Sequence, residues 1–291
     1  MTTTVGVVGA GDAGSALVRG WLRSPAPQFQ VFVHEIAGTS AAELTEGRGA
    51  QGVEEHAEAV ALPEGVPIAA SLRELAARCD VILASVETRD ALAVLEAVRP
   101  DLSADKIVLS SAAGISLDRL RAALGPGPAL FRIVCNRGVE VAEGVVVLSA
   151  EPGTPDAIVE RTKTLFAGLG VVELLLEDSF DAAAAVAGSS ITLLAVALEG
   201  VEDGAVKAGL PRQTARAFVR QTALATALLL QSHPGSPADL KDQVASPGGT
   251  TIAGLAVLED LGVRGAFMRA VRHSAESGRH GEDADRSPVV E

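Results

Sequence analysis

The chain opens with a glycine-rich segment whose spacing suits it to holding a phosphate. Gly9, Gly11 and Gly14 follow an apolar run, and a segment of helical pattern comes directly after them. In a strand–turn–helix unit, the first glycine allows a tight turn and the second lets the backbone approach a pyrophosphate. The third lets the helix pack close to the sheet. The sequence therefore predicts a dinucleotide site formed by Gly9, Gly11, Asp12, Ala13 and Gly14.

A carboxylate stands where a unit of this kind would place it. Glu35 ends the second predicted strand, 21 residues beyond Gly14. A carboxylate in this place accepts hydrogen bonds from a ribose diol and repels a 2′-phosphate. We therefore expect NADH or NADPH as the cofactor, with NADH favoured. The alternative, that Glu35 is a surface charge at the end of a strand, stays open.

A second glycine motif lies towards the other end of the chain. Ser246, Gly248, Gly249, Thr250 and Thr251 come just before an apolar helical pattern. Backbone N–H groups and hydroxyls would meet there at the positive end of a helix, an arrangement that suits a small anion such as a carboxylate. A plain helix start capped by Thr250 or Thr251 explains the same pattern. The spacing does not decide between these two interpretations.

The composition excludes several classes of function. The net charge of −13 over 291 residues opposes binding to nucleic acid. The two cysteines form no Cys-x-x-Cys pair and the five histidines lack metal-ligand spacing, so we expect no disulfide and no metal site. Because the chain has no tyrosine, reductase mechanisms with a tyrosine proton donor are excluded. The amino-terminal segment lacks the pattern of a signal peptide, and we expect a cytoplasmic protein.

The elements that must position these motifs follow from the hydrophobic pattern. It predicts strands at 5–8, 30–34, 81–85, 106–110, 129–134, 145–148 and 171–175, and helices at 13–23, 71–78, 89–98, 117–124 and 155–169. Residues 36–66 are predicted as a helix and an irregular acidic loop. The alternation indicates an α/β fold, with a Rossmann-like doubly wound parallel sheet covered on both faces.

Only helices are predicted beyond this region, at 178–208, 213–231 and 251–277, the last interrupted near 262–265, with a loop at 233–237. We expect a dinucleotide-binding domain over 1–176, an all-helical domain over 177–278, and a disordered tail over 279–291.

One stretch of the first long helix, 182–198, is uncharged over 17 residues. Its length touches the lower limit for a membrane span, but its small polar residues and the missing aromatic belt oppose that interpretation. A helix that is apolar on all sides must be buried. We therefore expect it inside a homodimer or higher homo-oligomer, with no membrane partner.

The segment from Asp239 to Ile252 resembles the signature of the pyrroline-5-carboxylate reductase family. Other stretches are similar to that family in order and spacing, at 9–17, 110–115, 132–136, 143–144, 188–190, 203–211 and 254–270. The resemblance implies a Rossmann domain followed by a helical dimerisation domain. It also implies that a nicotinamide hydride reduces a cyclic imine bearing a carboxylate.

The same resemblance assigns roles to residues. It implies that the Ser246–Thr251 loop holds the substrate carboxylate at a dimer interface, and that Thr251, the catalytic candidate, lies near the imine nitrogen. Asn136 and Ser190 match further substrate positions. Residues at two cofactor turns are matched as well: Ser85, Val86, Ala112, Ala113 and Gly114, of which the last three pass beside the nicotinamide ribose. Such a reaction needs mainly positioning, and its proton can come from water or a hydroxyl.

The chain departs from the family at three places near the implied reaction centre. Glu87-Thr88 stands where the family has Lys-Pro, Val134–Val139 keeps only Asn136 of Met-Pro-Asn-Thr-Pro-Ala, and Ile191–Leu193 replaces Pro-Ala-Tyr. Arg137 is new, and is either a partner for an extra acidic group or an exposed loop arginine. Three hypotheses stay open: a reductase of another imine acid, the proline-forming enzyme itself, and a dinucleotide-binding protein without catalysis.

Overall fold

The computed structural model describes residues 3–24, 29–35, 62–233 and 235–279. They form two compact units: Met1–Gly188 with Ser274–Glu291, as far as these are described, and Ser189–His273. Two helices, α7 (Glu177–Lys207) and α11 (Val263–Arg279), contribute residues to both units. The helix and loop predicted over 36–66 and the tail predicted over 279–291 lie largely outside the described residues.

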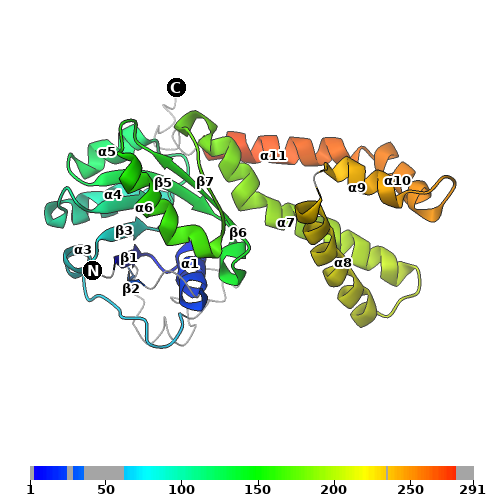
Figure 1. Cartoon of the computed structure of the whole chain (residues 1–291), viewed down its shortest axis with the longest axis horizontal. Coiled ribbons are helices and arrows are strands. Elements are labelled where there is room, and N and C mark those ends of the chain that lie inside the picture. The colour runs from blue at the N-terminus through cyan, green and yellow to red at the C-terminus, as the bar shows by residue number, and fades with distance from the viewer. Residues whose placement is uncertain (1–2, 25–28, 36–61, 234, 280–291) are drawn as a thin grey trace, which may run out of the picture. The chain divides into compact units, whose positions relative to one another are not determined.

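The first unit is built around a sheet (Figure 1). Within the described residues this sheet has seven strands, in the order β2-β1-β3-β4-β5-β6-β7. The strands are β1 (Thr4–Val8), β2 (Gln30–His34), β3 (Val81–Ala84), β4 (Ile107–Ser110), β5 (Ala129–Cys135), β6 (Gly144–Ala150) and β7 (Gly170–Leu174). The order reverses at β1, because β2 and β3 flank it on opposite sides. In such sheets the ligand crevice opens at the carboxyl ends of the strands beside this reversal.

One strand pair departs from the predicted parallel arrangement, since β5 and β6 run antiparallel. Only the 3₁₀ segment η2 (Arg137–Val141) joins these strands, whereas parallel neighbours need a crossover of about a dozen residues or more. Asn136 starts the reversal by accepting the N–H of Gly138 at 3.0 Å. Ala142 completes it in the left-handed region, with φ 61°.

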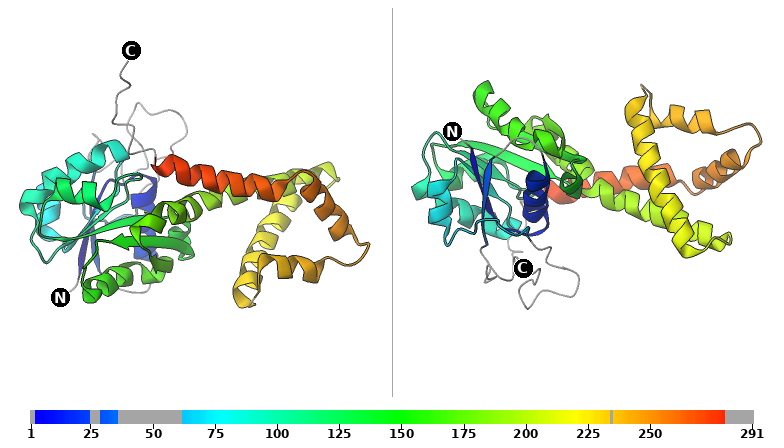
Figure 2. Two further views of the ribbon diagram at one scale, coloured as in Figure 1. Left: turned by 90° about the horizontal axis from the view of Figure 1, so that it is seen from above. Right: turned by 60° about the horizontal axis from the view of Figure 1, so that its bottom comes forward.

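Helices cover both faces of the sheet, as Figure 2 shows for the first unit. They are α1 (Asp12–Arg23), α3 (Leu72–Arg78), α4 (Thr88–Val98), α5 (Leu117–Leu124) and α6 (Asp156–Phe166). Helices α1 and α6 pack on one face, and α3, α4 and α5 pack on the other. Strands β1, β3 and β4 are therefore buried on both sides, which explains their continuous apolar sequences. The fold class predicted from the sequence is confirmed.

The second unit is all-helical and contains most of α7 and α11 with α8 (Arg212–Ser232), α9 (Pro237–Val244) and α10 (Thr250–Asp260). The predicted interruption of the last helix is confirmed at Gly262, which has φ 65°. Helix α9 was not predicted. Its start is a capping box formed by Ser236 and Asp239, with Pro237 in the first turn. This signal lies inside a Pro- and Gly-rich stretch that suggests a loop.

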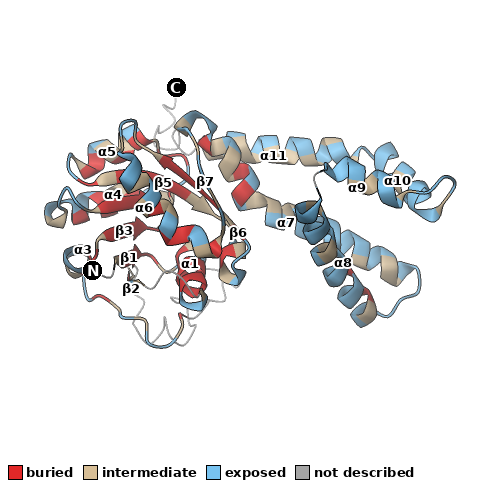
Figure 3. Ribbon diagram, viewed as in Figure 1, coloured by how far each residue is buried: buried red, intermediate tan, exposed pale blue. Residues whose placement is uncertain are grey.

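The second unit has almost no core of its own. Among its described residues, only Ala215 and Val219 are buried apolar side chains. Figure 3 shows the same contrast, with buried positions concentrated in the sheet and exposed ones along these helices. Helix α7 is the one described helix whose length and composition would allow it to cross a membrane. Its first turns pack on the sheet instead, where Phe180 and Ala187 are buried against Val147.

Candidate active site

The glycine loop after β1 has a geometry that requires glycine at two positions. Gly9 has φ 88°, and a Cβ there would collide with the carbonyl oxygen of Ser85. A Cβ on Gly14 would collide with the carbonyl oxygen of Gly9, so only glycine lets α1 begin this close to the loop. These two residues therefore set the entry of α1 into the fold.

Gly11 differs from these two glycines. Apart from its chain neighbours, no atom of the described residues lies within 4 Å of the position that a Cβ on Gly11 would take, so the space beside it is open in this part of the chain. Gly11 is also the N-cap of α1, and no side chain caps the helix there. An open space at an uncapped helix N-terminus fits a phosphate group, because backbone N–H groups and the helix dipole both favour an anion. The residues present therefore fit a dinucleotide.

Glu35 is hydrogen-bonded to this loop. Its Oε2 accepts the N–H of Ala10 at 2.7 Å, and the N–H of Gly9 is donated to the carbonyl of His34 at 2.9 Å. The carboxylate therefore lies at the edge of the glycine loop, with its orientation fixed by the backbone. This is the place at which a ribose diol next to the pyrophosphate would meet it.

The two predicted cofactor turns lie at the same edge of the sheet. Ser85 and Val86 lie against Gly9, since atoms of both residues are within 3 Å of the place that a Cβ on Gly9 would take. The N–H of Ser111 bonds to the carbonyl of Ala84 at 3.0 Å. The Ala112–Gly114 turn follows, with Gly114 at φ 65°. Sequence reasoning treated Thr88 only as a departure. Its hydroxyl donates to the carbonyl of Ala113 at 3.3 Å, so it holds one turn against the next.

Glu87, the anion that replaces a family lysine, lies before the first turn of α4. It forms an ion pair with Arg89 at 2.9 Å, and both side chains are largely exposed. An exposed pair of this kind contributes little to stability. The positive charge of Arg89 nevertheless partly offsets the negative charge of Glu87.

The two ends of the Asn136 amide have different surroundings. Its Oδ1 accepts the N–H groups of Gly138 and Val145 at 3.0 Å and 3.3 Å. Within the described residues its Nδ2 has no acceptor, so the donor side of the amide is the part that a ligand could use. Arg137, the next residue, is 57% exposed and pairs with Glu140 at 3.3 Å. Glu140 is already held by the buried Arg19 at 2.7 Å.

The two cysteines are poor candidates for a catalytic nucleophile. Both are free, and burial raises the pKa of the Cys135 thiol to about 12. A thiol with such a pKa is protonated at neutral pH and is a poor nucleophile. Among the described residues, no three His, Cys, Asp or Glu side chains gather into a metal-binding group.

The loop before α10 departs from an ordinary capped helix. Gly249, not a threonine, occupies the N-cap, and no side chain caps the helix. The alternative in which Thr250 or Thr251 caps the helix is therefore wrong. Gly248 has φ 68°, and the N–H of Gly249 turns back to the carbonyl of Ser246 at 3.1 Å. The first-turn N–H groups and the exposed threonine hydroxyls thus form a suitable cradle for a small anion.

The structure divides the predicted substrate residues between the two units. Asn136 belongs to the first unit, whereas Ser190 and the Ser246–Thr251 loop belong to the second. The predicted cofactor residues, by contrast, all lie in the first unit and surround one edge of its sheet.

Sequence reasoning missed one cluster close to this edge. Arg132 is a buried cation within the apolar β5, and it pairs with Glu177 and Asp181 in the first turns of α7. The charged residue in an otherwise apolar strand and the acidic pair at i and i+4 were the available signals. Nothing in the local sequence connects the two elements.

Comparisons with known proteins agree with this geometry. The family model described as pyrroline-5-carboxylate reductase dimerisation matches residues 177–280. A second model, described as NADP oxidoreductase coenzyme F420-dependent, matches residues 4–114. The two models together cover the helical unit and the part of the sheet that carries the glycine loop.

Curated relatives match over most of the chain. The pyrroline-5-carboxylate reductase of Glycine max is 30% identical over 280 residues, which is 95% of both chains. That of Arabidopsis thaliana is 34% identical over 215 residues, 74% of this chain and 78% of the relative. That of Escherichia coli (strain K12) is 29% identical over 293 residues, 95% of this chain and 97% of the relative.

Solved structures show the same fold. The 1-pyrroline-5-carboxylate reductase of Streptococcus pyogenes has a TM-score of 0.79 at 27% identity, covering 96% of this chain and 98% of that one. The pyrroline carboxylate reductase of Plasmodium falciparum, solved with NADP bound, has a TM-score of 0.81 at 23% identity with the same coverage. The resemblance identified from the sequence is confirmed, and the chain belongs to the pyrroline-5-carboxylate reductase family.

Proposed function

We propose that this protein is an oxidoreductase that reduces the C=N bond of a cyclic imine carboxylic acid with a nicotinamide cofactor, NADH being favoured. The observation that carries the cofactor assignment is the open space at Gly11, at an uncapped helix end with Glu35 fixed beside it. The names of the relatives support the class of reaction, since each is a pyrroline-5-carboxylate reductase.

When bound, the cofactor supplies a hydride, and residues of the chain position the cofactor and the substrate. The glycine loop receives the pyrophosphate at the N-terminus of α1. Glu35 accepts hydrogen bonds from a ribose diol and repels a 2′-phosphate, which is the basis of the preference for NADH. The Ala112–Gly114 turn holds the ribose on the nicotinamide side. Placing donor and acceptor in this way provides most of the rate enhancement that such a transfer needs.

The Ser246–Thr251 loop holds the substrate. The N–H groups in the first turn of α10 and the Ser246 and Thr250 hydroxyls bind the carboxylate, which suits the absence of a side-chain cap. The Thr251 hydroxyl lies near the imine nitrogen and relays the proton that the product amine gains. Asn136 and Ser190 complete the substrate contacts, with the Nδ2 of Asn136 as a donor.

The substrate we favour is an imine acid other than pyrroline-5-carboxylate. The reason is the changed segment Val134–Val139, which keeps Asn136 and adds Arg137. Because Arg19 already holds Glu140, the half-exposed Arg137 has a positive charge that can attract a second acidic group. The names of the relatives favour the second candidate, pyrroline-5-carboxylate itself. Rescue of a proline auxotroph separates the two, since only the second candidate predicts growth.

Thr251→Val tests the role of the loop, because it removes the hydroxyl and keeps the shape of the side chain. We expect kcat with the best imine acid to fall by about a hundredfold, the scale of one general acid. The matched control is Thr164→Val, which removes an exposed hydroxyl bonded only to the carbonyl of Glu160 on α6. Steady-state kinetics that show equal kcat values for the two variants would reject a catalytic role for Thr251.

A further inference from the structure

A buried cation on β5 is paired with two carboxylates at the start of α7. Arg132 on β5 has a side chain that is only 5% exposed, and a buried charge is costly unless it is paired. Its Nη1 lies 3.3 Å from Glu177 Oε1, and its Nη2 lies 3.1 Å from Asp181 Oδ1. The guanidinium also stacks 4.3 Å above the ring of Phe180. Within the described residues its Nε has no hydrogen-bond partner, so the cation depends strongly on the two carboxylates.

The Glu177 carboxylate has a second contact. The same Oε1 accepts the N–H of Leu117 at 2.6 Å. Leu117 is the first residue of α5, and its N–H is one of the groups that a helix leaves without an internal partner. A carboxylate at this end also complements the helix dipole. One oxygen atom therefore links the start of α7, the middle of β5 and the start of α5.

The start of α5 is also the far end of the turn predicted to hold the nicotinamide ribose. The near end of that turn is fixed to the sheet, where the N–H of Ser111 bonds to the carbonyl of Ala84 at 3.0 Å. Thr88 holds the middle through the carbonyl of Ala113. Beyond Gly114, Ile115 and Leu117 pack in the core, and the contact from Glu177 to Leu117 adds a charged attachment.

We infer that Glu177 is a positioning residue for the nicotinamide half of the cofactor, and that Arg132 holds Glu177 in place. This inference rests on the proposed function, because it takes the Ala112–Gly114 turn as the ribose contact. Without the carboxylate, the far side of the turn keeps the packing of Ile115 and Leu117 in the core but loses its charged attachment. The cofactor then binds less tightly, and the hydride donor is held less accurately, so both KM for NADH and kcat change.

The experiment compares Glu177→Ala and Glu177→Gln with the wild type. The glutamine keeps an oxygen that can accept the N–H of Leu117 but loses the charge that faces Arg132. We expect the Kd for NADH, from fluorescence titration, to rise by about tenfold in Glu177→Ala, the scale of one hydrogen bond to a charged group. Glu177→Gln should lie between Glu177→Ala and the wild type. The KM for NADH should follow the same order.

The matched control is a carboxylate with the same kind of contact at the opposite edge of the sheet. Asp80 Oδ2 accepts the N–H of Thr4 at 2.9 Å, at the amino end of β1. Asp80→Ala and Asp80→Asn should lower the melting temperature but leave the Kd for NADH within about twofold of the wild type, less than the scale of one hydrogen bond. A purely structural role for Glu177 predicts the same pattern for its own variants.

The outcomes separate this inference from the proposed function. If the wild type binds NADH and Glu177→Ala binds it with the same Kd, the inference is overturned and the proposed function stands. If the wild type binds neither NADH nor NADPH, the proposed function fails, and the inference fails with it. A graded rise in Kd, with the glutamine variant intermediate and both Asp80 variants unaffected, supports the inference.

Discussion

Two buried arginines, Arg19 and Arg132, determine how several carboxylates behave. Arg19 on α1 donates to Glu140 Oε1 at 2.7 Å, and Arg132 on β5 donates to Glu177 and Asp181. Arg19 and Arg132 are each less than a tenth exposed. In such places an arginine that loses its partner is left as an uncompensated charge, so the carboxylates contribute more than surface ones do.

The hydrogen bond from Arg19 is the main reason that the pKa of Glu140 is lowered below its ordinary value. Because the folded pKa lies below the unfolded one, the native state binds fewer protons between these values. The stabilisation is therefore present above the ordinary glutamate pKa and is lost as the pH falls through the folded pKa.

Glu140→Gln should show this dependence in urea unfolding followed by the fluorescence of Trp21, the only tryptophan in the chain. At pH 7 we expect a loss of about 1 kcal/mol in unfolding free energy, the scale of a screened hydrogen bond to a charged group. The difference should shrink as the pH drops below about 4. The control is Glu160→Gln, whose exposed pair with Lys163 should contribute little at either pH. An equal loss at pH 7 and below pH 4 would contradict this assignment.

Single residues differ in how far the sequence reveals them. Gly9, Gly14 and Glu35 were predicted as cofactor residues from spacing, because a strand–turn–helix unit is local, and the structure places Glu35 against the glycine loop. Glu177 was not identified, because its contacts with Leu117 and Arg132 join residues 60 and 45 positions away. Contacts of that kind depend on the packing of the whole unit.

At the scale of elements, the glycine loop and α1 act as one structure. Gly14 allows α1 to approach the loop, and Gly11 leaves open the space at the helix end. We therefore expect alanine in place of Gly14 to affect folding, and alanine in place of Gly11 to affect cofactor binding.

Gly11→Ala should fold as the wild type does, because its φ of −62° suits alanine and no other described residue has an atom within 4 Å of the new methyl group, chain neighbours apart. It should nevertheless lower the affinity for NADH by about tenfold or more, because the methyl group stands where the pyrophosphate approaches. Gly14→Ala should instead lose about 1–3 kcal/mol of stability through overpacking. Thermal unfolding with NADH titration checks both, and a Gly11→Ala protein with wild-type affinity would show that the phosphate binds elsewhere.

How well each helix or strand could be predicted depends on whether its sequence signal is local. The strands were located within a few residues, most clearly β1, β3 and β4, which are buried and continuously apolar. The direction of β6 was not predicted, since it depends on the shortness of the η2 connection and on Asn136. Helix α9 was missed because its capping residues also belong to the set that forms loops.

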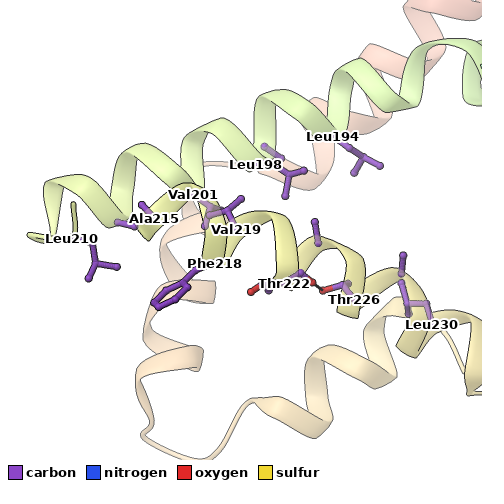
Figure 4. A pocket seen from close by; sticks show the side chains of 14 residues that line it. Leu194, Leu198, Val201, Leu210, Ala215, Phe218, Val219, Thr222, Thr226 and Leu230 are labelled. Atoms are coloured by element: carbon purple, nitrogen blue, oxygen red, sulfur yellow. Dashed lines mark hydrogen bonds between the residues drawn. The ribbon is translucent and has the colours of Figure 1, made fainter. Parts of the chain in front are cut away.

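At the scale of the whole molecule, the second unit exposes a large apolar surface. A groove of about 490 Å³ runs between α7 and α8 and is lined almost entirely by apolar side chains (Figure 4). Its members include Leu194, Val201 and Phe218, which are 57%, 59% and 59% exposed. A contiguous apolar surface of this kind marks a protein interface. We propose that a second copy covers it, in agreement with the dimerisation model that matches this region.

Phe218→Asp should weaken that assembly, because it places a charge on the apolar groove. Light scattering at micromolar concentration should give at least a dimer for the wild type and a smaller species for the variant. The control, Val171→Asp, changes a residue that is similarly exposed, at 54%, on β7 of the first unit. A wild type that is monomeric, or a Phe218→Asp protein that assembles as the wild type does, would contradict this proposal.

Reduction of a cyclic imine acid by this protein can be followed as oxidation of NADH and NADPH, in parallel, by the purified protein. The substrates are pyrroline-5-carboxylate and a panel of other five- and six-membered cyclic imine carboxylic acids. We predict consumption of NADH, faster than that of NADPH, with at least one of these acids. If neither nucleotide is oxidised with any of them, while fluorescence shows that NADH binds, the protein is not a reductase of this class of substrate.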